Sequence, residues 1–90
     1  MRTINIIDED ITMGDRGCEN SCPIALALRH EYKTTNVSVV MEDIPYIYVN
    51  DDELDMTSDM RDIVDNFIRK FDSGQNVKPF TLEVEWLKYF

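Results

Sequence analysis

The chain has 90 residues, 43% of them hydrophobic, and its 18 acids against 9 bases give a formal net charge of −9 at pH 7. This length and apolar content predict one folded domain, residues 1–90, and no apolar run approaches the roughly 18 residues that span a bilayer. The acidic balance argues against direct nucleic-acid binding, which needs clustered lysines and arginines.

The first part of the chain predicts a strand, a loop and the start of a helix. Ile4 and Ile6 alternate with polar neighbours, which indicates a short strand with one buried face. Turn-favouring residues at 11–21 predict a loop of about ten residues. Pro23 suits the first position of a helix because its missing N–H is no loss there, and Cys22 is then the N-cap.

This first helix is expected to end at the polar residues 34–36. Its opening run, Ile24–Leu28, is apolar all round, which predicts cover on more than one side, by the sheet and, in a homodimer, by a second subunit. The β-branched and aromatic segments Val37–Met41 and Tyr46–Val49 predict a β-hairpin, with Pro45 near the start of its second strand. One long bulged strand is the alternative.

A second helix and a last strand follow. The predicted helix has Thr57 or Ser58 as its N-cap and Gly74 at its end. Its apolar stripe repeats at intervals of three and four residues: Met56, Met60, Ile63, Val64, Phe67, Ile68 and Phe71. Residues 80–86 then alternate strictly, so Phe80, Leu82, Val84 and Trp86 are expected on one buried face of a strand.

In chain order these elements read β-α-β-β-α-β. We therefore predict an α+β fold in which two helices pack on one face of a small, mostly antiparallel, four-stranded sheet, as in a ferredoxin-like sandwich.

The acidic residues offer a first candidate site. Nine of the 18 acids lie between Glu42 and Asp65, where Arg61 is the one base. Of these acids, Asp55, Asp59, Asp62 and Asp65 are predicted to fall on or beside one exposed face of the second helix, opposite the apolar stripe. The residues predicted to bind a basic partner are Asp51, Asp52, Asp55, Asp59, Asp62 and Asp65. The alternative is a solvated face that keeps a small protein soluble.

The loop before the first helix offers a second candidate site. It brings polar groups and two thiols to a helix N-terminus, where unpaired amides bind anions and lower the pKa of thiols. The candidate ligand-binding residues are Asp15, Arg16, Cys18, Asn20, Cys22 and Arg29. The alternative is that both cysteines are buried fillers of the core.

Metal and catalytic chemistry have weaker signals. Zinc needs four ligands, and beyond Cys18 and Cys22 the one imidazole is His30, so we predict no metal and no cofactor. The acidic tract 50–55 lacks the glycine and the distal glutamate of a calcium loop. No nucleophile elbow, phosphate-binding glycine loop or HExxH motif is present, and an enzyme is not predicted.

Two longer motifs carry a resemblance. The first is Gly14…Gly17-Cys18…Cys22-Pro23-Ile24-Ala25, and the second is Phe71-Asp72-Ser73-Gly74-Gln75-Asn76-Val77-Lys78-Pro79-Phe80. With these the chain resembles a group of small phage and prophage-type proteins that have no assigned activity. The resemblance implies a protein of the host cytoplasm that binds and disables host machinery. The absence of a secretory signal at residues 1–8 also indicates the cytoplasm.

Three hypotheses follow. The protein is a non-catalytic inhibitor that binds a host protein with a basic surface, such as a CRISPR effector, through the acidic helix face. Alternatively, an oligomer, such as a dimer, sequesters a nucleotide signal at the loop with Arg16, Arg29 and Lys33. The third hypothesis is a thiol redox or zinc protein that uses Cys18 and Cys22. None involves a membrane.

Overall fold

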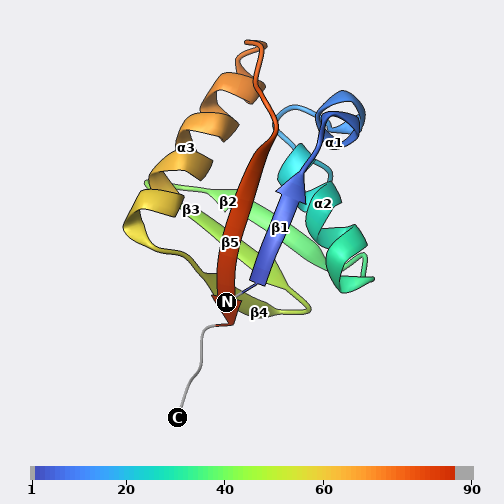
Figure 1. The fold of residues 1–90 in the computed structure, drawn as a ribbon, viewed down its shortest axis with the longest axis vertical. Helices are drawn as coiled ribbons and strands as arrows, with labels where there is room; N and C mark the ends of the chain where they lie inside the picture. The colour runs from blue at the N-terminus through green and yellow to red at the C-terminus, as the bar shows by residue number, and fades with distance from the viewer. Residues whose placement is uncertain (1, 87–90) are drawn as a thin grey trace.

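The structure, a computed structural model, describes the backbone of residues 2–86 and the side chains of residues 2–85. Its elements are β1 (Arg2–Ile6), α1 (Asp8–Met13), α2 (Pro23–Tyr32), β2 (Val37–Met41), β3 (Pro45–Val49), β4 (Asp52–Asp55), α3 (Ser58–Asp72) and β5 (Phe80–Trp86) (Figure 1). The predicted α+β class is confirmed. Among the helices of residues 2–86, none combines the length and the apolar character that crossing a bilayer requires.

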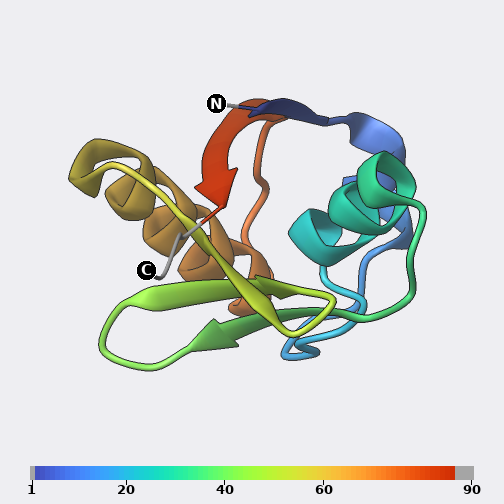
Figure 2. The ribbon, with the colours of Figure 1, turned by 90° about the horizontal axis from the view of Figure 1, so that it is seen from below.

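The strands form one sheet in the order β1-β5-β4-β3-β2, and all four neighbouring pairs are antiparallel. Among the described residues, β4 and β5 pair at Leu54↔Trp86 and Asp55↔Glu85, and the sheet bends strongly at this junction (Figure 2). As a result β1 and β5 lie on one side of the core and β2 and β3 on the other, while α2 and α3 close the two remaining sides (Figure 2). β1 and β2 are the edge strands.

The core follows from the alternation in the strands. The register places the buried strand side chains on one face, as in the pairs Ile4↔Leu82 and Ile47↔Leu54. The two longer helices add their apolar stripes to the same cluster. In β5 the predicted alternation is confirmed for Leu82 and Val84, which are buried, whereas the side chain of Trp86 lies outside the described residues.

The prediction of a loop at residues 11–21 is wrong for its first residues, because helix α1 occupies Asp8–Met13. The acids Asp8, Glu9 and Asp10 sit in the first turn of α1, where the helix dipole favours negative charge. The Asp10 carboxylate also accepts a hydrogen bond from the Ile7 N–H at 3.1 Å, which satisfies an amide at the helix start. The loop therefore begins at Gly14.

The prediction of four strands is also wrong, because part of the acidic tract forms a fifth strand, β4. Asn50 and Asp51 both have positive φ, 52° and 70°, and make the tight turn that folds β4 back on β3. Local sequence disfavours a strand at Asp52–Asp55. The strand forms because β3 and β5 both offer it pairing partners and because Leu54 is buried in the core.

Both longer helices start where the sequence predicts. Cys22 caps α2 by accepting a hydrogen bond from the Ala25 N–H at 3.5 Å, and Thr57 caps α3 by accepting one from the Met60 N–H at 3.1 Å. One member of the predicted stripe is misplaced, because Ile63 is 50% exposed. α3 buries a narrower face than the repeat suggests, and Ile63 lies at its margin.

Candidate functional site

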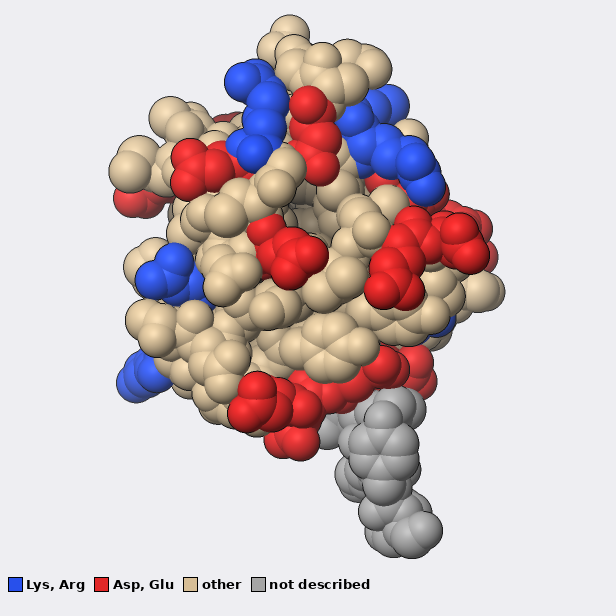
Figure 3. All heavy atoms as spheres, turned by 180° about the vertical axis from the view of Figure 1, so that it is seen from behind, with Lys and Arg blue, Asp and Glu red and all other residues tan. Residues whose placement is uncertain are grey.

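The six aspartates predicted to bind a partner do not form one surface. Asp51 and Asp52 lie at the β3–β4 turn, Asp55 lies at the far end of β4, and Asp59, Asp62 and Asp65 lie on α3. The turn is held against the end of α2, because the Thr34 hydroxyl donates to Asn50 Oδ1 at 2.7 Å. On the face seen in Figure 3, acidic side chains gather in several separate groups. The six aspartates are therefore divided between the β3–β4 turn and the α3 side of the molecule.

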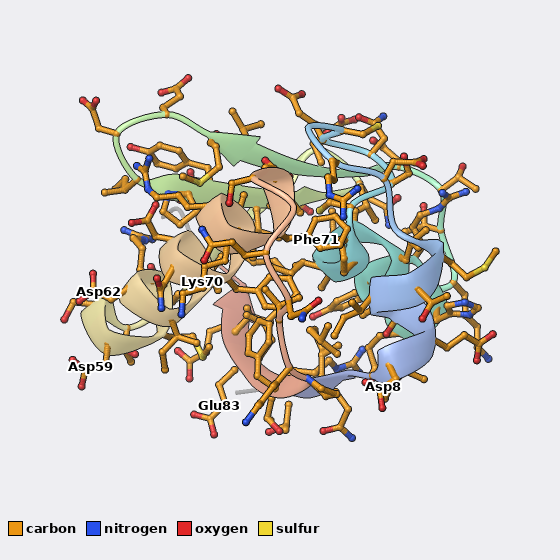
Figure 4. The ribbon with its side chains drawn as sticks, turned by 90° about the horizontal axis from the view of Figure 1, so that it is seen from above. Asp8, Asp59, Asp62, Lys70, Phe71 and Glu83 are labelled. Carbon is orange, nitrogen blue, oxygen red and sulfur yellow. The ribbon has the colours of Figure 1, made fainter. Side chains whose placement is uncertain are left out.

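The acids on the α3 side differ in whether a base neutralises them. Asp55 is 3.7 Å from the Arg61 guanidinium, and Asp65 accepts a hydrogen bond from Arg69 Nε at 2.8 Å. Asp59 and Asp62 are exposed and have neither an ion pair nor a side-chain hydrogen bond among the described residues. Figure 4 shows both pointing away from the core. Uncompensated charge is thus concentrated at the N-terminal end of α3.

Glu83 joins this surface, and the sequence analysis did not select it. The Glu83 N–H donates to Met60 Sδ at 3.4 Å, which places β5 directly beside the first turn of α3. The Glu83 carboxylate points outward on the same side as Asp59 (Figure 4). The alternation of β5 had predicted that Glu83 faces solvent, but not which element lies next to it. We call Asp59, Asp62 and Glu83 the α3 acidic surface.

The loop before α2 is fastened to the C-terminal end of α3. Arg16 Nε donates to the Phe71 carbonyl at 3.1 Å, and the Arg16 guanidinium lies 5.6 Å from the centre of the Phe71 ring. The Gly17 N–H donates to Asp72 Oδ1 at 2.9 Å. The two motifs that carry the phage-type resemblance therefore contact each other. These contacts satisfy carbonyl and amide groups that a helix end and a loop leave unpaired.

Cys18 and Cys22 line a small pocket of about 180 Å³ at the base of this loop. The pocket is completed by Gly17, Glu19, Val39, Met41, Ile68 and Asp72. Hydrogen bonds with the Ser21 hydroxyl and with backbone amides lower the pKa of the Cys18 thiol. Burial raises the pKa of Cys22 to about 11. Both are free thiols, and Cys22 is the buried filler that the alternative interpretation describes.

The residues predicted to bind a nucleotide are split by α2. Asp15, Arg16, Cys18, Asn20 and Cys22 lie in the loop at its N-terminus, whereas Arg29 and Lys33 lie near its C-terminus. A helix of 10 residues is about 15 Å long, so these groups do not surround one ligand. Arg29 and Lys33 instead border an open groove of about 710 Å³ with Leu26, His30, Thr34 and Thr35.

Within residues 2–86 no three His, Cys, Asp or Glu side chains are grouped so that they could hold a metal ion. No protein-family model matches the chain, and neither a curated protein nor a solved structure matches it significantly. The candidate sites therefore rest on geometry and charge.

Proposed function

We propose that this protein is a non-catalytic binding protein that docks on a basic surface of another protein through its α3 acidic surface. The observation that carries the proposal is the group formed by Asp59, Asp62 and Glu83, three exposed carboxylates from two adjacent elements. Like charges at neighbouring helix positions are unfavourable in the free protein. A basic partner would relieve that repulsion and gain Coulomb attraction.

The class of partner follows from the same charges. Grooves lined with lysine and arginine bind nucleic-acid phosphates, and a group of exposed carboxylates competes for the same cations. The phage-type resemblance implies that such a groove belongs to a host protein, for example a CRISPR effector. The proposed activity is therefore inhibition by occupation of a nucleic-acid site, in the host cytoplasm and without chemistry.

The alternatives have less support. A nucleotide sponge needs Arg16 to face a ligand, but its guanidinium is engaged by Phe71 at the end of α3. A thiol protein needs both cysteines to react, but Cys22 is buried and its pKa is raised.

The proposal is tested with a charge-matched pair of variants. Asp59→Asn/Asp62→Asn removes two charges from the α3 acidic surface, and Asp51→Asn/Asp52→Asn removes two from the β3–β4 turn. Binding of each protein to a lysine- and arginine-rich peptide is measured by fluorescence anisotropy. We expect the α3 variant to bind roughly 3- to 30-fold more weakly, because each exposed charge contributes up to about 1 kcal/mol. The turn variant should bind nearly as the unmodified protein does.

Equal losses in the two variants would show that net charge, and not the α3 acidic surface, attracts the peptide. The target class is tested separately, by adding the same proteins to a DNA-cleavage assay of a CRISPR effector. Inhibition that the α3 variant loses and the turn variant keeps supports a target of that class.

A further inference from the structure

An apolar cleft lies open on the other side of the molecule, between α1 and α2. Its volume is about 460 Å³. Ile7 and Met13 border it and are 48% and 68% exposed. The cleft is also lined by Asn5, Glu9, Asp10, Leu26, Ala27 and His30. Exposed large apolar side chains that share one depression indicate an interaction surface more strongly than scattered ones.

This cleft continues into the groove at the C-terminal end of α2. Leu26 and His30 line both depressions. Leu26 is half-buried and His30 and Lys33 are exposed, and they follow one another at helical spacing, so one stripe over the C-terminal half of α2 and its cap is open to solvent. We call the cleft, the groove and this stripe the α1–α2 edge.

The side chains that line the two depressions carry opposite charge, with Glu9 and Asp10 in the cleft and Arg29 and Lys33 at the groove. Glu9 lines the cleft, and Asp8 is exposed at the start of α1, a helix that has no basic residue. Arg29 and Lys33 border the groove at the other end. Figure 1 shows α1 and the C-terminal end of α2 at opposite ends of the same side of the molecule. Along that side, Figure 3 shows acidic side chains toward the α1 end and basic ones toward the α2 end.

Lys33 lies where α2 ends at the groove. It is the C-cap of α2 and has a left-handed backbone, with φ 53° and ψ 47°. Glycine is usual at such a position, because a residue with a Cβ is sterically disfavoured there. Lys33 is exposed and borders the groove, so its ammonium group adds positive charge at this end of the edge.

We propose that the α1–α2 edge is the interface of a symmetric homodimer. A two-fold axis through the apolar cleft would place the acidic α1 of one protomer against the basic end of α2 of its partner, and the reverse contact would form at the same time. Ile7, Met13 and Leu26 of both protomers would then cover each other. The same surface is therefore complementary to itself in charge and in apolar character, which favours a second copy of this chain as the occupant.

The experiment is a charge exchange followed by sedimentation velocity over a range of concentrations. One variant, Arg29→Glu/Lys33→Glu, makes both ends of the edge acidic. The other, Asp8→Lys/Glu9→Lys, makes both ends basic. Each variant alone should dimerise at least about 10-fold more weakly, because like charges then face each other. Mixed in equal amounts, the two should form a heterodimer, since both contacts are again between opposite charges.

Two controls make the result decisive. Asp59→Lys/Asp62→Lys changes the net charge as much as the second variant but lies outside the edge, and it should dimerise as the unmodified protein does. Circular dichroism identifies any variant that fails to fold, and formation of the heterodimer itself requires both partners to be folded. The proposal is overturned if the unmodified protein remains monomeric at all concentrations. It is equally overturned if the folded variants dimerise no better mixed than alone.

Discussion

Cys22 shows how one side chain serves two purposes. Its sulfur accepts the Ala25 N–H that the start of α2 leaves unpaired, and its burial fills the space between α2 and the sheet. Sequence identified it as the N-cap because Pro23 fixes the helix start. The burial of its thiol could not be predicted, because it depends on tertiary packing and not on the residues next to Cys22.

The buried thiol predicts a specific loss of stability in alkali. The pKa of Cys22 is about 11 in the folded protein, against an ordinary value of 9.0 that applies when the chain is unfolded. Between these values the unfolded chain releases a proton that the folded one keeps, so stability falls by about 1.4 kcal/mol per pH unit. Below pH 9 this contribution is constant. Urea unfolding of Cys22→Ser, which caps the helix without titrating, should show a flatter decline from pH 9 to 11. Parallel curves would contradict the assignment.

At the scale of elements, the sequence predicted those features that depend on interactions between a few neighbouring residues. The N-caps Cys22 and Thr57 and the alternation of β5 are fixed by a few neighbouring residues, and the structure confirms them. β4 was not predicted because it forms only by pairing with β3 on one side and β5 on the other. The local sequence shows neither the turn that brings β4 back against β3 nor the packing that brings the remote β5 beside it. Glu83 was missed for the same reason, since only tertiary packing brings β5 beside α3. The sequence therefore predicted two of the three acids of the α3 acidic surface, Asp59 and Asp62, but not Glu83.

The junction between the loop and α2 predicts an asymmetric response to alanine. A Cβ on Gly14 would lie 2.6 Å from Pro23 Cδ and 2.7 Å from Pro23 N, a stiff ring and a backbone atom that cannot move aside. Gly14→Ala should therefore lower the free energy of unfolding by about 1–3 kcal/mol.

Gly17 has open space but φ +66°, so Gly17→Ala should lower the free energy of unfolding by about 1 kcal/mol. Gly17→Asn should lower it less, because asparagine tolerates that conformation. Denaturant titrations of the three variants, together with Gly14→Asn, test this. A Gly14→Asn protein as stable as Gly17→Asn would contradict the steric explanation.

At the scale of the whole molecule, the charges are arranged so that different parts of the surface suit different neighbours. The α3 acidic surface is of one sign and suits a basic partner. The α1–α2 edge has one sign at each end and suits its own copy. These surfaces are on opposite sides of the core, flanking α3 and α2 respectively (Figure 2). A dimer formed through the edge would therefore leave both acidic surfaces accessible, and one dimer would present two of them.

Salt should consequently affect folding and partner binding in opposite directions. At about 0.01 M salt the Debye length is about 30 Å, comparable with the molecular dimensions of 41 × 26 × 21 Å, so the net charge of −9 repels itself across the whole fold. At about 0.15 M it shortens to about 8 Å. If screening recovers about 1 kcal/mol, the thermal midpoint rises by roughly 4–8 °C. Peptide binding through the α3 acidic surface should weaken over the same range. Asp59→Asn/Asp62→Asn, with less charge to screen, should gain less stability from salt. A midpoint that falls with salt would mean that attractive pairs, either Arg69–Asp65 within a protomer or the opposite charges proposed to meet across the α1–α2 edge, outweigh the repulsion between the unpaired acids.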